Sequence, residues 1–280
     1  MNDSDIAHAI QANVTAALAE DIGKGDLTAQ LIPADRVARA SLITREQAVL
    51  CGKPWFEACF QALDPRVKIA WLASEGEQVE PNAILCEIQG NARALLSAER
   101  PALNFLQTLS ATATSARCFV DAVAGTQAKI MDTRKTLPGL RIAQKYAVRV
   151  GGGVNQRIGL FDGVLIKENH IAAAGSIQAA LAAAQHQAGP DVTIQIEVES
   201  IDELQAALNA GAKLILLDNF SIAQMREAVQ MTQQRAELEA SGGITLENVR
   251  AIAKTGVSRI SIGGLTKHVY AVDLSLRIQM

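Results

Sequence analysis

The chain has few aromatic residues, no large excess of either charge and no long uninterrupted apolar run. Aromatic residues make up 4% of the 280 residues and the formal net charge is -3, which disfavours both a base-stacking platform and global attraction to nucleic acid. The most apolar runs, 101–116 and 172–190, are interrupted by polar side chains, so we expect neither to cross a membrane. The sequence therefore predicts no nucleic-acid and no membrane partner.

Cysteine and histidine are also scarce. The four cysteines lie far apart without a CxxC pair, and none of the four histidines has HExxH spacing. This spacing argues against a disulfide framework and a zinc hydrolase, and we expect buried, reduced thiols. The motifs GxxxxGK(S/T), GxGxxG and GxSxG are absent as well. The N-terminus, MNDSDIAH, is too polar for a secretory leader, so we expect a cytoplasmic protein.

The front part of the chain has the pattern of an α+β domain with mostly antiparallel strands. Helical spacing at 5–20 is followed by strand patterns at 36–45 and 66–72, with a helix near 54–63 between them. A turn-rich strand pair is expected at 75–90. A long helix then runs from 92 to about 123, and Pro101 marks a kink or a helix start in it.

After residue 125, short apolar strands alternate with helical segments. The strand candidates are 128–132, 163–167, 193–198, 213–218, 237–241 and 258–263. Repeated βα units of this kind predict a parallel sheet. We expect an incomplete α/β barrel of about six strands, and the alternative is an open, doubly wound sheet.

Charged residues or glycines follow every one of these strands. They are Asp132 to Lys135, Lys167-Glu168, Glu197 with Glu199, Asp218-Asn219, Ser241 to Gly243, and Gly263-Gly264. In α/β barrels the active site lies at the carboxyl ends of the strands, so we expect these residues to surround a single active site. The two glycine pairs follow the last two strands, where backbone N–H groups can approach a phosphate.

Two further patterns point to a charged ligand. Alternation in 193–198 directs Gln195 and Glu197 into the barrel, where Glu197 serves either in an ion pair or, with Asp218, as a ligand of a metal or a substrate hydroxyl. Segment 129–157 is strongly basic. A solvated helix face explains three of its cations, Arg141, Lys145 and Arg149, whereas Arg134, Lys135 and Arg157 fit a multiply anionic ligand.

The sequence resembles the quinolinate phosphoribosyltransferase family over nearly its whole length. The main match is DTRKTLPGLRIAQKYAVRVGGGVNQRIGLFDGVLIKENHI at 132–171. Further matches are GKGDLT (23–28), LLSAERPALNFLQTLSATAT (95–114), ILLDNFS (215–221), EASGGIT (239–245) and IGGLTKHVYAVDLSLR (262–277). The combination of DTRKT, GGG-x-N and IKENH is highly specific.

The resemblance implies a fold and a reaction. An α/β sandwich domain, 1–112, would be joined by residues 268–280 packing back on it, and 113–267 would form an incomplete α/β barrel. Quinolinate would attack C1 of 5-phosphoribosyl 1-pyrophosphate (PRPP), giving nicotinate mononucleotide, pyrophosphate and carbon dioxide, as in de novo NAD biosynthesis. Mg²⁺ would accompany the pyrophosphate, and a homodimer would share its active sites.

The resemblance also assigns roles to single residues. Those for quinolinate are Arg100 from the neighbouring subunit, Thr133, Arg134, Gln156, Arg157 and Lys167. Those for PRPP and phosphate are Lys135, Ser241, Gly242, Gly243, Ile262, Gly263 and Gly264. The residues assigned to the chemistry itself are Lys135, Lys167, Glu197 and Asp218, of which Glu197 and Asp218 would also meet the metal. Many family members have His where this chain has Gln156; Gln cannot titrate but can donate a hydrogen bond.

Three other functions compete with this one. A related phosphoribosyltransferase of the same fold would act on another acid. A Schiff-base aldolase would use Lys167, but would leave Arg100, Arg134 and Arg157 without a role. A lipoyl or biotinyl carrier hairpin at 75–90 would need a lysine at its tip, and the sequence has none between Lys68 and Lys129.

Overall fold

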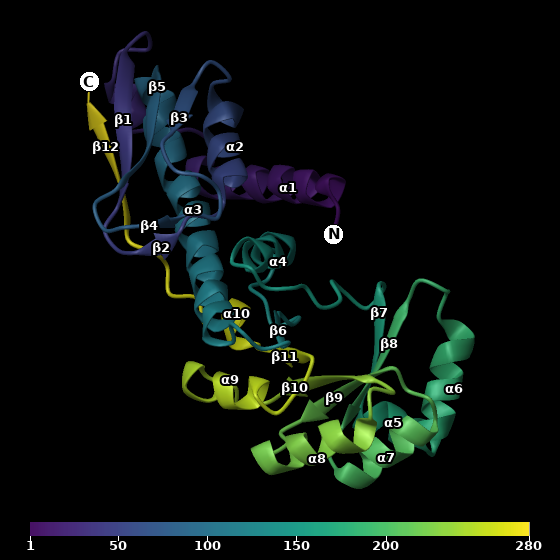
Figure 1. The fold of residues 1–280 in the computed structure, drawn as a ribbon. Helices are drawn as coiled ribbons and strands as arrows, with labels where there is room; N and C mark the ends of the chain where they lie inside the picture. The colour runs from purple at the N-terminus through teal and green to yellow at the C-terminus, as the bar shows by residue number, and fades with distance from the viewer. Residues whose placement is uncertain (280) are drawn as a thin grey trace. The chain divides into compact units, whose positions relative to one another are not determined.

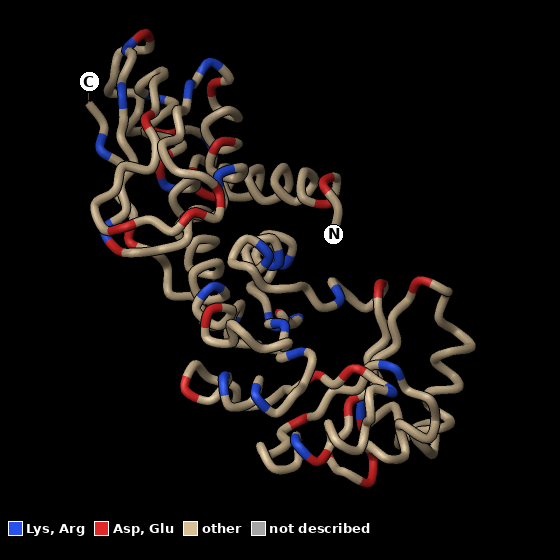
Figure 2. The backbone as a smooth tube through the Cα atoms, in the orientation of Figure 1, with Lys and Arg blue, Asp and Glu red and all other residues tan. Residues whose placement is uncertain are grey.

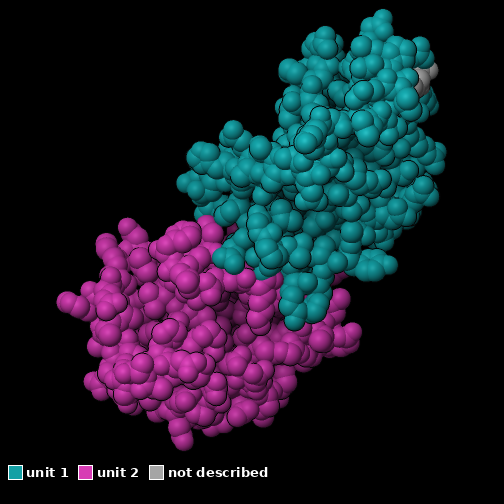
Figure 3. All heavy atoms as spheres, turned by 180° about the vertical axis from the view of Figure 1, so that it is seen from behind, with its two compact units in different colours: residues 1–117, 136–152, 265–280 teal, residues 118–135, 153–264 magenta. Residues whose placement is uncertain are grey.

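A computed structural model describes residues 1–279, and its contacts divide the chain into two compact units (Figure 3). Unit 1 consists of residues 1–117, 136–152 and 265–280, and unit 2 of residues 118–135 and 153–264. Basic and acidic residues are interspersed along both units (Figure 2), so attraction of an anion must arise locally. In the described part of the chain, no helix is both long and apolar enough to cross a membrane.

Unit 1 contains an antiparallel sheet covered by helices (Figure 1). Its elements are α1 (Asp3–Ile22), η1 (Ala29–Leu31), β1 (Val37–Thr44), β2 (Ala48–Val49), α2 (Lys53–Leu63), β3 (Lys68–Trp71), β4 (Gln78–Val79), β5 (Ile84–Asn91), most of α3 (Ala92–Ala122), α4 (Arg141–Val150), most of α10 (Gly264–Lys267) and β12 (Leu274–Gln279). Within residues 1–279, the main sheet has the order β12-β1-β5-β3. The chain's last strand therefore completes the first domain by pairing with β1.

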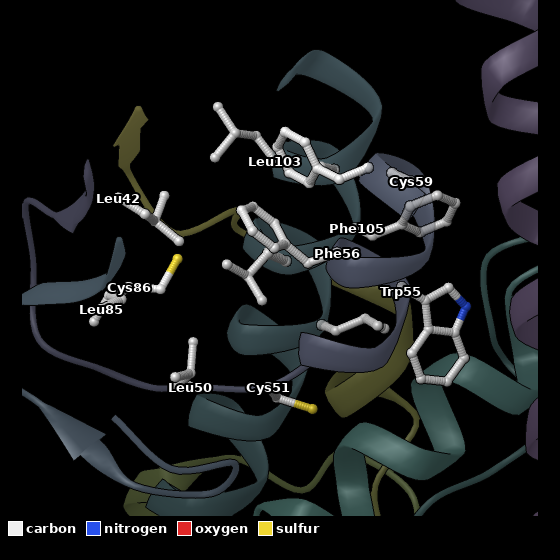
Figure 4. Close-up of a cluster of buried hydrophobic side chains, with 14 of the residues drawn as sticks. Leu42, Leu50, Cys51, Trp55, Phe56, Cys59, Leu85, Cys86, Leu103 and Phe105 are labelled. Carbon is white, nitrogen blue, oxygen red and sulfur yellow. The ribbon is translucent and has the colours of Figure 1, made fainter. Parts of the chain in front are cut away.

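The core of unit 1 follows from alternation in the strands and amphipathic spacing in the helices. On β1 the side chains of Ala38, Ala40 and Leu42 are buried, whereas the alternating Val37 and Arg39 are exposed. Figure 4 shows Leu42 and Cys86 of the sheet near Phe56 of α2. Helix α3 continues through Pro101, which neither starts nor ends it.

Three expectations for this part of the chain are corrected. Strands β4 and β5 exist, but they do not pair with each other: β4 pairs with β2, and β5 lies between β1 and β3. Lys145 is fully buried, so the basic side of α4 is not entirely solvated. Three cysteines are buried as expected, but Cys118 is exposed.

Unit 2 is built from βα units. Its elements are β6 (Lys129–Met131), β7 (Gly163–Ile166), α5 (Glu168–Ala174), α6 (Ile177–Gln187), β8 (Thr193–Val198), α7 (Ile201–Asn209), β9 (Leu214–Asp218), α8 (Ile222–Thr232), β10 (Glu237–Ser241), α9 (Leu246–Ala253) and β11 (Arg259–Ser261). All pairings in this sheet are parallel. Every expected strand is thus present, with its ends shifted by at most two residues.

The strand order distinguishes a barrel from a doubly wound sheet. Within residues 1–279 the order is β6-β11-β10-β9-β8-β7, so the first strand pairs with the last and the others follow in sequence. A doubly wound sheet instead grows in both directions from its first strands. The order is that of a barrel left open between β6 and β7, which confirms the incomplete α/β barrel.

Candidate functional site

A pocket of about 610 Å³ lies at the carboxyl ends of the strands of unit 2. It is lined by Thr133, Arg134, Lys135, Gln156, Arg157, Leu165, Lys167, Glu197, Leu216, Asp218, Asn219, Ser241, Gly242, Gly243 and Ser261. Strand alternation accounts for this set. Leu216 and Asp218 face the pocket, while Leu217 between them is fully buried. The ring of polar strand ends expected from the sequence is therefore present.

Lys167 and Glu197 form an ion pair within this pocket. Lys167 Nζ donates to both carboxylate oxygens of Glu197, at 2.9 and 2.8 Å. The Glu197 side chain is 10% exposed and that of Lys167 is 44% exposed, so the lysine can meet a ligand while still paired. Of the two roles considered for Glu197, the ion pair is present, and the neighbouring strand places Asp218 in the same pocket.

Two arginines bring positive charge to one side of the pocket. Arg157 donates from Nη1 to the carbonyl oxygen of Gly163 at 2.8 Å, which fixes its guanidinium at the start of β7. Burial lowers the pKa of Arg157, the charge of Arg134 lowers it further, and Asp162 opposes both effects. The influence of Arg134 means that two guanidinium charges repel each other here. An anionic ligand between them would relieve that repulsion.

The glycines after β10 and β11 permit close backbone contacts. Gly242 has φ +94°, and a Cβ on it would lie 2.0 Å from Asn219 Oδ1. Gly243 has φ +59° with open space around its Cβ position. A Cβ on Gly263 would lie 2.8 Å from Cδ of Lys135, so that lysine passes directly over the glycine. The predicted phosphate residues are thus next to the predicted PRPP lysine.

Gln156 is held from both its backbone and its side chain. Its backbone nitrogen donates to Asp132 Oδ1 at 2.8 Å. Its side-chain Nε2 donates to Glu239 Oε1 at 2.7 Å and to Gln195 Oε1 at 3.1 Å. The two hydrogens of this amide nitrogen therefore both have acceptors inside the barrel, so donation to a substrate would require one of these bonds to break.

Comparisons with known proteins match most of the chain to one family. The family model described as quinolinate phosphoribosyl transferase, N-terminal domain, matches residues 26–110, and the one for the C-terminal domain matches residues 112–277. This chain belongs to the quinolinate phosphoribosyltransferase family.

Relatives in this family resemble the chain over nearly its full length. A carboxylating nicotinate-nucleotide pyrophosphorylase of Mycobacterium leprae is 43% identical over 278 residues, covering 96% of each chain. A probable carboxylating nicotinate-nucleotide pyrophosphorylase of Bacillus subtilis is 42% identical over 261 residues, covering 93% of this chain and 90% of that protein. The structure of the nicotinate-nucleotide pyrophosphorylase from Francisella tularensis has a TM-score of 0.94 at 46% identity, covering 97% of this chain and 96% of that one.

Most residues that the family resemblance selected lie in the one pocket, and a few do not. Ile262, Gly263 and Gly264 directly follow the lining residue Ser261, and Ile262 itself is buried. Arg100 is exposed on α3. It belongs to unit 1, so its role toward the pocket of unit 2 stays a prediction.

The two carboxylates fit a magnesium ion that a substrate also ligates. Within residues 1–279 no cluster of three or more His, Cys, Asp or Glu side chains could enclose a metal. Mg²⁺ prefers oxygen ligands and is commonly held by one or two carboxylates, water and substrate phosphates. Glu197 and Asp218, on neighbouring strands, match that donor set.

Sequence reasoning missed one buried residue of the site, Glu239. It lies in the middle of β10, is 0% exposed and accepts hydrogen bonds from Gln156 and Gln195. The signal was present in the strand ELEAS, where Glu237, Glu239 and Ser241 alternate with Leu238 and Ala240. The same alternation that placed Gln195 inside the barrel places Glu239 there too.

Proposed function

We propose that this chain transfers the phosphoribosyl group of PRPP to quinolinate with loss of carbon dioxide, giving nicotinate mononucleotide and pyrophosphate. The observation that carries the proposal is the joint lining of one pocket by Arg134, Arg157 and Lys167, by two carboxylates and by the Ser241-Gly242-Gly243 turn. The cations suit a dicarboxylic acid, and the turn suits a phosphate. The names of the relatives describe the same conversion.

The chemistry asks the protein for positioning more than for a nucleophile. The lone pair of the pyridine nitrogen bonds to C1 of the ribose, while the C1–O bond breaks and its electron pair leaves with pyrophosphate. The 2-carboxylate is then lost as carbon dioxide, its bonding pair passes to the ring carbon, and that carbon takes up a proton. Arg134 and Arg157 would orient the dicarboxylate so that the nitrogen faces C1.

The remaining residues of the pocket would hold PRPP. Lys135, lying over Gly263, would contact the anionic groups of PRPP, and Asp218 and Glu197 would meet the ribose hydroxyls and Mg²⁺. When bound, the ion would neutralise charge on the leaving pyrophosphate. Lys167, beside Glu197, would meet a quinolinate carboxylate. Positive charge developing on the ribose would be stabilised by the two acidic side chains.

We further propose a cytoplasmic homodimer in which Arg100 completes the partner's site. What supports this is an exposed arginine on α3 within the SAER segment of the family resemblance. Size measurement by light scattering would test the dimer, and fractionation of cells producing the protein would test its location.

Turnover with quinolinate and PRPP, with nicotinate as the control acid, tests the main proposal. We expect turnover of quinolinate and a strong preference for it, because the pocket carries more cations than one carboxylate needs. Equal use of nicotinate would contradict the preference. Turnover of another acid instead of quinolinate would favour the related phosphoribosyltransferase.

The roles of the two carboxylates have their own test. We expect Glu197→Ala and Asp218→Ala to weaken the use of PRPP and Mg²⁺ more than the binding of quinolinate. Variants that bind quinolinate poorly but keep normal PRPP affinity would contradict this assignment.

A further inference from the structure

The carboxylate of Glu239 is buried behind the pocket and has no part in the roles assigned above. Its Oε1 accepts a hydrogen bond from Gln156 Nε2 at 2.7 Å, and its Oε2 accepts one from Gln195 Nε2 at 3.0 Å. Gln156 lines the pocket, whereas Glu239 and Gln195 are 0% and 5% exposed. A fully buried carboxylate is costly unless it is hydrogen-bonded, so this trio depends on its donors and acceptors being matched.

The contacts define the orientation of the Gln156 amide. A glutamine side chain has two N–H donors at one end and one carbonyl acceptor at the other. Both acceptors that face Gln156 Nε2, on Glu239 and Gln195, come from inside the barrel. If the amide turned over, its carbonyl oxygen would face these two oxygens and the hydrogen bonds would become repulsions. The nitrogen end is therefore fixed toward the interior.

We propose that Glu239 is a positioning residue for the acid substrate: by fixing the Gln156 amide, it sets the polarity of the pocket wall beside Arg157. The inference rests on the proposed function only for the identity of the ligand, quinolinate. Burial raises the pKa of Glu239, while hydrogen bonds from Gln195, Ser261 and Gln156 and the charge of Arg259 oppose the rise. Each carboxylate oxygen nevertheless accepts a hydrogen bond from an amide, Oε1 from Gln156 and Oε2 from Gln195.

Glu239→Gln is the sharpest perturbation because it preserves size and changes one acceptor into a donor. With an amide at position 239, no set of orientations pairs a donor with an acceptor at all three contacts of the trio. Gln156, which lines the pocket, can shift more readily than Gln195, which is 5% exposed. Because Gln156 is then no longer held in one orientation beside Arg157, we expect KM for quinolinate to rise roughly tenfold, the scale of one hydrogen bond, with KM for PRPP little changed. Glu237→Gln is the matched control: this residue is on the same strand, its side chain is 56% exposed and it pairs with Arg259.

A double-mutant cycle separates positioning from a general role in the fold. If Glu239 acts through Gln156, then Glu239→Gln raises KM for quinolinate no further in a Gln156→Ala background. The combination Gln195→Glu with Glu239→Gln exchanges amide and carboxylate, so that Gln156 again meets two acceptors. We expect this exchanged pair to restore KM for quinolinate. Effects of Glu239→Gln and Gln156→Ala that add in full, or no restoration by the exchange, would overturn the proposal.

Binding measurements keep the inference separable from the reaction. Calorimetric titration with quinolinate alone should show the same loss in Glu239→Gln and the same recovery in the exchanged pair. Wild-type protein that binds quinolinate but does not turn it over with PRPP would contradict the proposed function only, whereas equal quinolinate affinity of wild type and Glu239→Gln would contradict this inference only. No quinolinate binding by the wild type would overturn both. If Glu239→Gln does not fold, the double variant Gln195→Glu with Glu239→Gln provides the test. Normal quinolinate affinity of this double variant supports the proposal, and lost affinity contradicts it.

Discussion

A methyl group added at Gly242 tests the close packing that surrounds the phosphate turn. Gly242→Ala would place Cβ 2.0 Å from Oδ1 of Asn219. Asn219 has little room to move: its backbone nitrogen donates to the Ser241 carbonyl oxygen at 3.0 Å, and its Nδ2 donates to Asp218 Oδ2 at 2.8 Å. Relief of the clash must therefore displace the amide that contacts Asp218, so the change should reach the PRPP site.

Gly243→Ala supplies the matched control because it shares the backbone strain without the clash. Both glycines have positive φ, at +94° and +59°, but a Cβ on Gly243 meets open space. A left-handed conformation costs a non-glycine residue about 1–2 kcal/mol, and overpacking adds about 1–3 kcal/mol. We therefore expect Gly243→Ala to lose only the first amount of unfolding free energy and Gly242→Ala to lose both.

The assay must report on unit 2. Both tryptophans, Trp55 and Trp71, lie in unit 1, so their fluorescence would follow the other unit. Hydrogen exchange of the β9 and β10 amides across a urea titration gives the local unfolding free energy, and KM for PRPP gives the functional effect. Equal destabilisation by the two substitutions would refute the argument that Asn219 cannot yield.

Two other predictions test the dimer and the thiols. Arg100→Ala should fold normally and lose activity, because truncating an arginine paired with a desolvated carboxylate costs roughly 2–5 kcal/mol. Mixing this variant with Lys167→Ala should restore part of the activity, because each mixed dimer has one intact site. Mixed dimers that form without activity would exclude a role of Arg100 across the interface. Burial raises the pKa of Cys59 and of Cys86 to about 12. A thiol reagent near neutral pH should therefore label the exposed Cys118 first. Rapid labelling of Cys59 or Cys86 in folded protein would contradict this packing.

Local patterns were sufficient to predict the barrel because each βα unit carries its own signal. Short apolar segments located β8 and β10 at their observed ends, and the polar strand ends located the pocket. Pairing partners were harder to predict. The segment at 75–90 has two strands close in sequence, yet β4 pairs with β2 and β5 with β1 and β3. Hairpin-like spacing does not determine which edge offers the better match of hydrogen bonds and buried faces.

Burial of charged residues was predictable only where strand alternation applied. On a helix, Lys145 has the same spacing as Arg141 and Arg149, and spacing alone made all three solvated. The structure buries Lys145 completely, which depends on what packs against α4 and not on α4 itself. Cys118 shows the opposite case, since its apolar character favoured burial while its position on α3 leaves it exposed.

The trio of Gln156, Gln195 and Glu239 shows why the hydrogen bonds inside the barrel could not be predicted from the sequence. Its hydrogen bonds join residues 39, 44 and 83 positions apart in the sequence, so no local pattern contains them. Each member alone is an ordinary polar residue on an inward-facing position, and burying it without partners would destabilise the barrel. Among the described residues, no buried side-chain nitrogen or oxygen lacks a partner. The polar interior of this barrel is therefore stable only as a matched set, and a matched set fixes the orientation of its one member at the pocket, Gln156.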